Sequence, residues 1–303
     1  MNIYISVVFG MILLSQAVKC SNPTEGLFDS NLPALKDINE VPVDLEVPEI
    51  SNEPPARGKR VKQVLEEYED TEVYHILYLP TNWKLGKKFP VIVEYPGNGP
   101  YTNKYGDECA GIPDDTNLGY GISGGRDFVW VSLPFISLDG RQNQLKWWGD
   151  VDASVKYTIE AVKKVCREFG GDEKLVFLAG FSRGAIGSNY IGLHDDEIAG
   201  LWCAFILFSH YDGVRDWGYE GADKASAVRR LERLRGRPQL IMQEGTGTKE
   251  TKEFLESTGI KGNFTYLNIP YRNHNDKWVL QNIPERRFLR QWVADVIDYR
   301  KRE

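Results

Sequence analysis

The stretch Leu175–Gly184, LVFLAGFSRG, decides the fold. It begins as an apolar run typical of a buried strand, ends in the pattern G-x-S-x-G around Ser182, and leads into a predicted helix over 184–194. In such a strand–turn–helix the serine stands at the tip of a tight turn, because a side chain at either flanking glycine would collide with the neighbouring strand or helix. The pattern therefore predicts that Ser182 is a nucleophile at the carboxyl edge of a sheet. The following helix directs its amino terminus at developing negative charge.

Strands and helices alternate on both sides of this turn. Apolar, β-branched and aromatic runs bounded by Pro or Gly predict strands at Glu72–Pro80, Phe89–Gly97, Phe128–Phe135, Leu175–Phe181, Leu201–Ser209, Gln239–Gln243 and Phe264–Pro270. Apolar residues at helical spacing predict helices over 150–169, 184–194, 224–235, 249–257 and 285–300. Strands joined by helical crossovers form a mostly parallel sheet. We therefore expect one α/β domain over residues 61–303, with helices on both faces of the sheet.

The first sixty residues differ in character from the rest. Residues 1–20 contain a run of apolar side chains that is typical of a secretory signal peptide and too short to span a bilayer. Residues 21–60 contain six prolines among acidic residues, which predicts a segment that wraps the surface or stays disordered. This segment ends in Arg57-Gly58-Lys59-Arg60, the pattern that furin-like convertases cleave. Residues 21–60 are thus either a propeptide or a solvated linker.

Composition limits the classes of protein to which the chain can belong. Of its 303 residues, 42% are hydrophobic and 26% charged, which is ordinary for a globular protein and excludes a disordered or coiled-coil chain. A net charge of −6 argues against nucleic acid as a partner. Beyond the signal segment no run is long and apolar enough to span a membrane, so we expect a secreted, extracellular protein with no membrane partner once the signal is removed. Four cysteines suit neither a disulfide scaffold nor a metal site, and Asn263-Phe264-Thr265 is an acceptor for N-glycosylation.

The turn at Ser182 and its setting resemble those of the α/β-hydrolase family. Phe169–Gly184, FGGDEKLVFLAGFSRG, is similar to the same stretch in secreted polyhydroxybutyrate depolymerases and feruloyl esterases. The resemblance covers residues 72–300. It implies a triad in the chain order Ser, acid, His, and an oxyanion hole made of the backbone amide of Arg183 and of the loop Pro96–Gly99, here Gly97 and Asn98. The glycines of that loop independently allow backbone N–H groups to approach a ligand.

Only four histidines are available as the general base. His75 lies within a predicted strand, His194 at the end of a predicted helix, and His210 directly after a strand. His274 lies in a polar loop between the last strand and the last helix, where the resemblance places the base. A loop at the carboxyl edge can bring the ring within about 3 Å of the serine hydroxyl. We therefore predict that His274 is the base.

The acid of the triad is left open by the sequence. The family usually has Asp in a G-x-x-D loop, whereas this chain has Thr248 at that position of Gly245-Thr246-Gly247-Thr248. Asp212 and Glu244 are equal candidates, and Glu250 is a weaker one. The acid holds the histidine tautomer and stabilises the imidazolium, so any carboxylate that is aimed correctly will serve.

These residues predict a secreted serine hydrolase that cleaves carboxyl esters through an acyl-enzyme, without cofactor or metal. By resemblance, its substrate is a small-molecule or polymer ester of carbohydrate, phenolic or polyester type. Trp147 and Trp148 are candidate substrate-binding side chains, because aromatic rings beside polar residues suit such ligands. Two alternatives remain: a catalytically silent binding or structural protein on the same scaffold, and a metal site built from His210, Asp212 and His274.

Overall fold

The protein was analysed as a computed structural model, which describes residues 35–302. The predicted signal peptide and residues 21–34 of the proline-rich segment lie outside the described residues. These described residues form a nine-stranded sheet of order β1-β2-β3-β7-β4-β8-β9-β10-β11. Its strands are β1 Ile50–Ser51, β2 Arg60–Gln63, β3 His75–Tyr78, β4 Phe89–Tyr95, β7 Val129–Ser132, β8 Gly171–Phe181, β9 Ala204–Phe208, β10 Pro238–Glu244 and β11 Asn263–Ile269. Strand β3 pairs antiparallel with β2 and β7, and every other pairing in this sheet is parallel. The predicted mostly parallel sheet is confirmed.

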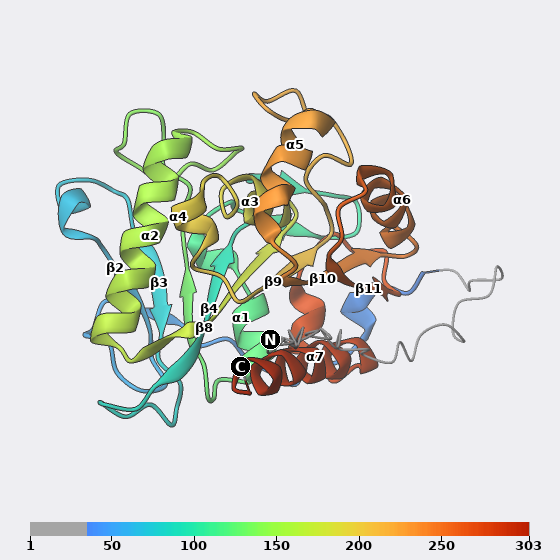
Figure 1. Cartoon of the computed structure of the whole chain (residues 1–303). Helices are drawn as coiled ribbons and strands as arrows, with labels where there is room; N and C mark the ends of the chain where they lie inside the picture. Colours follow the sequence, from blue (N-terminus) through green and yellow to red (C-terminus); the bar gives the residue numbers. More distant parts are fainter. Residues whose placement is uncertain (1–34, 303) are drawn as a thin grey trace, which may run out of the picture. The chain divides into compact units, whose positions relative to one another are not determined.

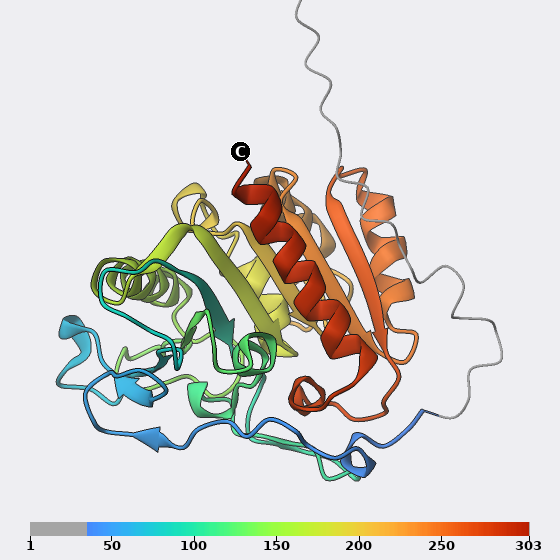
Figure 2. The ribbon, with the colours of Figure 1, turned by 90° about the horizontal axis from the view of Figure 1, so that it is seen from below.

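Helices cover both faces of the sheet, as the sequence predicts (Figures 1 and 2). The α-helices of the described residues are α1 Leu118–Ser123, α2 Val151–Glu168, α3 Arg183–Tyr190, α4 Asp196–Ala199, α5 Lys224–Leu231, α6 Thr248–Thr258 and α7 Pro284–Arg300. Side chains of α2, α3, α5 and α6 share one apolar cluster, and side chains of α1 and α7 share the other. No helix within residues 35–302 is long and apolar enough to cross a membrane.

The central strands are apolar on both sides because each side faces a helical layer. Val91 and Val93 of β4 lie in the first cluster, whereas Ile92 between them lies in the second. Strand β8 alternates in the same way, with Leu178 in the first cluster and Phe177 in the second. This two-sided burial explains why the strands read as continuous apolar runs.

Some elements have no counterpart in the prediction. The region 101–126, for which no strand or helix was predicted, contains α1 and a small hairpin of β5 Tyr101–Thr102 and β6 Glu108–Cys109. Strands β1 and β2 lie at the edge of the sheet, within and directly after the proline-rich segment. The proline-rich segment, predicted to wrap the surface or stay disordered, contributes β1 to the sheet, where it pairs in parallel with β2.

Residues 35–51, here called the N-terminal strap, run along the molecule to β2 (blue in Figure 2). The strap begins beside the loop that contains His274, where the Lys36 N–H donates to Pro270 O and the Arg272 N–H donates to Lys36 O. It continues through η1 Ile38–Glu40, a short 3₁₀ turn, whose Ile38 is only 1% exposed. Further along, the carboxylate of Asp44 pairs with both terminal nitrogens of Arg286 at 2.6 Å. Contacts of this number and kind make the strap part of the folded domain.

The predicted convertase site lies at the end of the proline-rich segment 21–60. Arg60 is buried, its guanidinium lies 4.9 Å from the centre of the Trp130 ring, and it donates a 2.6 Å hydrogen bond to Asp114 O. It is also the first residue of β2. Cleavage after Arg60 stays a prediction; in the folded chain it would require β2 to leave the sheet.

The burial of Ile38 predicts how strongly the strap is coupled to the fold. Replacing Ile38 by Ala should lower the free energy of unfolding by about 2–5 kcal/mol, as for other large-to-small changes in a core. Val43→Ala is the matched control: Val43 lies in the same strap, is 60% exposed, and should change stability by less than about 0.5 kcal/mol. Urea denaturation of the three proteins measures the difference. Equal stability of the two variants would show that the strap unfolds independently of the domain.

Candidate active site

Ser182 occupies the sharp turn between β8 and α3. Its backbone has φ 54° and ψ −114°, a conformation that non-glycine residues rarely adopt. A Cβ atom at Gly184 would lie 2.0 Å from Tyr95 O, and one at Gly180 would lie 2.2 Å from the Gly184 backbone. Both glycines are therefore required by close packing, for the reason that the sequence pattern gave. The turn leaves the serine side chain at the carboxyl end of β8.

His274 reaches this serine from the loop between β11 and the 3₁₀ turn η5 Lys277–Leu280. Its Nε2 lies 3.0 Å from Ser182 Oγ. The ring packs against the rings of Phe181, Tyr101 and His210, whose centres lie 4.9, 5.3 and 5.3 Å away. The imidazole is thus held in one place by aromatic contacts and is within hydrogen-bonding reach of the serine hydroxyl.

Glu244, the last residue of β10, is the carboxylate that contacts the histidine. Its Oε1 lies 3.0 Å from His274 Nδ1. With the ring hydrogen on Nδ1, the imidazole donates to Glu244, and its bare Nε2 can accept the hydrogen of Ser182. The three side chains form one hydrogen-bonded chain.

Asp212 is not part of this hydrogen-bonded series of side chains, and its prediction as the acid is wrong. Its two oxygens bind the guanidinium of Arg230 on α5, at 2.8 Å from Nε and 3.0 Å from Nη2. Burial raises the pKa of Asp212, and the hydrogen bonds and charge of Arg230 oppose that rise. The weaker candidate, Glu250, is exposed and pairs with Arg215 at 3.3 Å. Asp212 is a structural partner of α5.

Ser209 is a member of the site that the sequence analysis missed. Its hydroxyl donates to Glu244 Oε1 at 2.9 Å, and its oxygen lies 2.9 Å from His274 Nδ1. The Nδ1 hydrogen of His274 is therefore shared between the carboxylate and a hydroxyl oxygen. Ser209 holds this position with φ 86°, a left-handed conformation that favours glycine. A serine directly after a strand at the same sheet edge was the only signal for it in the sequence.

The predicted oxyanion loop follows β4 directly. The Oδ1 of Asn98 accepts the Trp147 N–H at 2.8 Å, and the Gly99 N–H donates to Leu145 O at 2.8 Å. A Cβ at Gly97 would lie 3.1 Å from Phe181 and Cys109 atoms. The loop is thus fixed beside the serine turn. The role of the Gly97 and Asn98 amides as oxyanion donors stays a prediction.

Arg183 supports the same region with its side chain. It is fully buried, and its guanidinium donates to the carbonyl oxygens of Gly111, Gln144 and Trp147. Burial lowers its pKa to about 9, so it stays charged at neutral pH. Its predicted role through the backbone N–H fits its place as the first residue of α3. The guanidinium ties together the loops around the site.

The two tryptophans predicted to bind substrate lie in different surroundings. Trp148 is 4% exposed and stacks on Tyr190 with ring centres 4.6 Å apart, so its interpretation as a substrate platform is wrong. Trp147 is half-buried and contacts the rings of Trp217 and Tyr219 at 5.8 and 5.2 Å. Of the pair, only Trp147 keeps a surface that a ligand could contact.

Within residues 35–302, His, Cys, Asp and Glu side chains form no cluster of three that could hold a metal ion. His210 packs against Trp217 at 5.2 Å, and Asp212 is engaged by Arg230. Burial, together with the nearby His274, lowers the pKa of His210 to about 4, so its ring is neutral at pH 7. The two histidines of the metal alternative are thus neighbours, but its carboxylate is held by Arg230.

A pocket of about 220 Å³ opens beside His274 and Glu244. Its wall includes the ring of Trp217 and the polar side chains of His210, Arg215, Gln243 and Glu250. The pocket combines one aromatic surface with several hydrogen-bonding groups. It suits a small polar group with a flat or ring-shaped face.

Two interacting carboxyl groups, Glu94 and Asp276, are buried near the histidine loop. Glu94 of β4 accepts hydrogen bonds from the backbone of Leu118 and Gly119 and from the indole of Trp130. Burial, with repulsion from Asp276, raises the pKa of Glu94 to about 8. Burial also raises the pKa of Asp276, two residues after His274, to about 6. The two groups resist being charged at the same time.

Comparison with known proteins shows the fold. No family model matches the chain, and no curated protein matches its sequence. Among solved structures, a fungal esterase from Rhizomucor miehei has a TM-score of 0.55 and 14% identity, over 80% of this chain and 84% of that one. An acetyl ester-xyloside bifunctional hydrolase from Caldicellulosiruptor lactoaceticus has a TM-score of 0.52 and 12% identity, over 80% and 97%. A putative dipeptidyl aminopeptidase IV from Bacteroides ovatus has a TM-score of 0.52 and 13% identity, over 81% of this chain but only 35% of that one. The chain has the α/β-hydrolase fold, as its sequence predicted.

The left-handed backbone of Ser209 predicts an unusual order of stability. Ser209→Ala and Ser209→Gly both lose the hydroxyl, but alanine keeps a Cβ at φ 86°. The glycine variant should therefore be the more stable of the two by about 1 kcal/mol, although glycine is normally the destabilising choice. Thermal or urea unfolding measures this. An alanine variant as stable as the glycine variant would contradict the strain.

The raised pKa values of Glu94 and Asp276 predict a dependence of stability on pH. A carboxyl whose pKa is higher in the folded than in the unfolded chain stabilises fully below its unfolded pKa, and this contribution is lost as pH rises through the folded value. The loss should therefore extend from about pH 4 to about pH 8. In Asp276→Asn, stability relative to the unchanged protein should improve by about 1 kcal/mol or more between pH 5 and pH 8. A difference that is constant over this range in urea denaturation would contradict the assignment.

Proposed function

We propose that this protein is a serine hydrolase that cleaves carboxyl esters. The observation that carries the proposal is the continuous chain from Ser182 Oγ to His274 Nε2 and from His274 Nδ1 to Glu244 Oε1, each step 3.0 Å. A serine hydroxyl alone is a weak nucleophile, and an imidazole oriented by a carboxylate is the arrangement that activates it. The esterases among the similar structures agree with this chemistry.

The reaction proceeds in two halves. In the first, His274 Nε2 takes the proton of Ser182 as Oγ bonds to the ester carbonyl carbon. The same proton then passes to the leaving alcohol oxygen as its bond to carbon breaks. In the second half, water gives a proton to His274, attacks the acyl-serine carbon, and releases the acid while the proton returns to Ser182. Glu244 stabilises the imidazolium in both halves, and the backbone N–H of Arg183 with the loop after β4 binds the oxyanion.

The pocket beside His274 supports a site for the alcohol part of the ester. Because His274 protonates the leaving oxygen, the leaving group must lie on its side of the serine. The pocket there has the Trp217 ring and polar side chains, which suit a sugar or phenolic alcohol better than a long aliphatic one. We therefore place carbohydrate and phenolic esters ahead of polyesters as substrates. The apolar run at the start of the chain supports secretion, which gives access to such extracellular material.

Activity assays test the proposal. A panel of short-chain, aryl and sugar-acetate esters should include substrates that the purified protein hydrolyses, and a fluorophosphonate probe should label it. Ser182→Ala should abolish both. Glu244→Gln should lower kcat by about 10³–10⁴-fold, because the amide no longer holds the required tautomer.

The rejected acid provides the matched control. Asp212→Asn should leave kcat of the folded fraction within about tenfold, because Asp212 binds Arg230 and not His274. A native chain that neither reacts with the probe nor hydrolyses any ester would overturn the proposal. That result would favour the alternative of a silent binding protein on this scaffold.

A further inference from the structure

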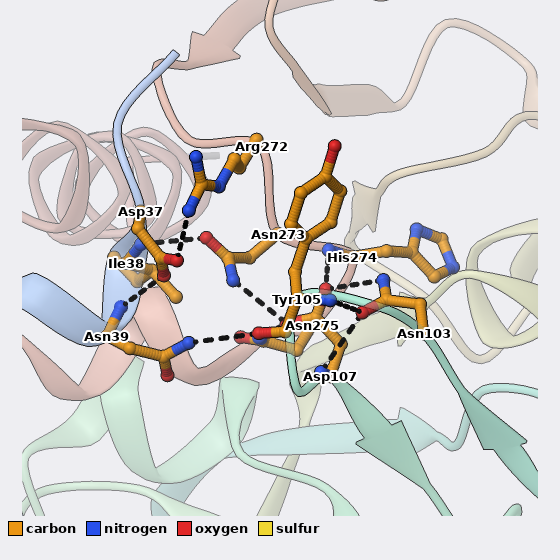
Figure 3. A network of polar contacts seen from close by, with 10 residues as sticks. All are labelled: Asp37, Ile38, Asn39, Asn103, Tyr105, Asp107, Arg272, Asn273, His274 and Asn275. Atoms are coloured by element: carbon orange, nitrogen blue, oxygen red, sulfur yellow. Dashed lines mark hydrogen bonds and ion pairs between the residues drawn. The ribbon is translucent and has the colours of Figure 1, made fainter.

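We propose that Asp107 is a positioning residue for His274, holding the main chain of the histidine loop so that the imidazole meets both Ser182 and Glu244. The inference rests on the proposed function and extends it to a residue more than 160 positions away in the sequence. Asp107 directly precedes the β6 strand of the small hairpin and is 1% exposed. Figure 3 shows it in the hairpin, where the histidine loop and the N-terminal strap approach.

The carboxylate of Asp107 grips consecutive residues of the histidine loop. Its Oδ2 accepts the backbone N–H of His274 at 2.8 Å. Its Oδ1 accepts the side-chain amide of Asn273 at 3.1 Å and that of Asn275 in a shorter contact. One side chain therefore fixes the histidine and the residue on either side of it. A carboxylate suits this task because its two oxygens can accept several hydrogen bonds at once.

The contacts of Asp107 explain how its charge is tolerated in a buried place. Besides these three donors, the side-chain amide of Asn103 donates to Oδ2 at 2.7 Å. A buried carboxylate costs several kcal/mol when it is left without partners, and hydrogen bonds to N–H groups offset that cost. The donors also depend on the carboxylate, because removing it would leave their buried N–H groups without an acceptor. The network is therefore sensitive to any change at Asp107.

The hairpin is itself rigid enough to serve as an anchor. Asn103 Oδ1 accepts the N–H groups of Tyr105 and Asp107, which closes the turn between β5 and β6. Tyr101, at the start of the hairpin, packs its ring against the His274 ring at 5.3 Å. The hairpin thus contacts His274 twice, through the main chain and through the ring.

The strap closes the network from the other side. The Oδ1 of Asn273, whose amide nitrogen binds Asp107, accepts the Ile38 N–H at 2.7 Å. The side chain of Asn39 donates to Tyr105 O in the hairpin at 3.3 Å. Arg272, one residue earlier in the histidine loop, pairs with Asp37 at 2.6 Å. Three segments that are far apart in the sequence therefore meet around one carboxylate.

Asp107→Asn tests the inference, since it removes the charge and one acceptor with almost no change in volume. We expect kcat on the best ester of the panel to fall by about 10–100-fold with KM within about threefold, because a shift of the base by about 1 Å costs that much in rate. The fall in kcat with a preserved KM is the discriminating readout, because a purely structural role would reduce the amount of folded enzyme and leave kcat of the folded fraction unchanged.

Glu108→Gln is the matched control. Glu108 is the next residue of the same hairpin, its side chain is exposed, and the substitution is again carboxylate to amide. It should leave kcat and KM unchanged. Asn275→Ala is a milder second variant, which keeps Asp107 and removes one of its donors; it should lower kcat by less than Asp107→Asn does. Its kcat tests the inference if Asp107→Asn does not fold.

A measurement without substrate separates this inference from the proposed function. In the unchanged protein, NMR of the histidine ring nitrogens should show the Nδ1 hydrogen of His274 protected in its bond to Glu244, and in Asp107→Asn that signal should broaden by exchange with water. Loss of the signal in a protein with no esterase activity would overturn the proposed function and keep the positioning role. An unchanged signal, with kcat and probe labelling within twofold of the original, would overturn the inference.

Discussion

The site depends on the approach of Ser182 Oγ and His274 Nε2, two atoms 92 residues apart in the chain and 3.0 Å apart in space. No local structure can make that contact. It arises because β8, β9, β10 and β11 run parallel and end at the same edge of the sheet, so that the residues following them are neighbours. Ser182, Ser209, Glu244 and His274 follow or end these strands in that order. The parallel sheet therefore brings the side chains of the site together, because its strands end side by side at one edge.

That geometry is maintained against local preference at two of these strand ends. Ser182 and Ser209 both have positive φ, which costs a non-glycine residue about 1–3 kcal/mol. Glycine would relieve the strain at both positions but has no hydroxyl. The Ser182 hydroxyl contacts His274 Nε2, and the Ser209 hydroxyl contacts His274 Nδ1 and Glu244. Strain of this kind persists only where the surroundings hold the backbone. Here the close packing of Gly180 and Gly184 and the ladders of β8 and β9 do so.

The sequence predicted the parts of the site that have local signals. Ser182 carried a pattern tied to a strand–turn–helix, and His274 lay in the only polar loop at the right place in the chain order. The acid had no such signal, because Glu244 and Asp212 both follow apolar strands, and only the side-chain partners distinguish them. Arg230, 18 residues beyond Asp212, engages one, and His274 engages the other. The strap and Asp107 were missed for a related reason: proline-rich and polar segments have no period, so their contacts with a distant loop cannot be read from spacing.

The placement of the buried carboxyl groups suggests why so many polar side chains lie beneath one edge of the sheet. Glu94, Asp107 and Asp276 are each at most 5% exposed, and each would be more stable in water unless the protein supplied donors. Two of them fix the histidine loop: Asp107 accepts the backbone N–H of His274, and Asp276, within the loop, accepts two hydrogen bonds from Asn117, the N-cap of α1. An apolar contact would stabilise these loops as well but would let them slide, since dispersion has no preferred direction. Hydrogen bonds to a fixed carboxylate define position to a few tenths of an ångström. A loop that must hold an imidazole between two partners needs that definition more than it needs added stability.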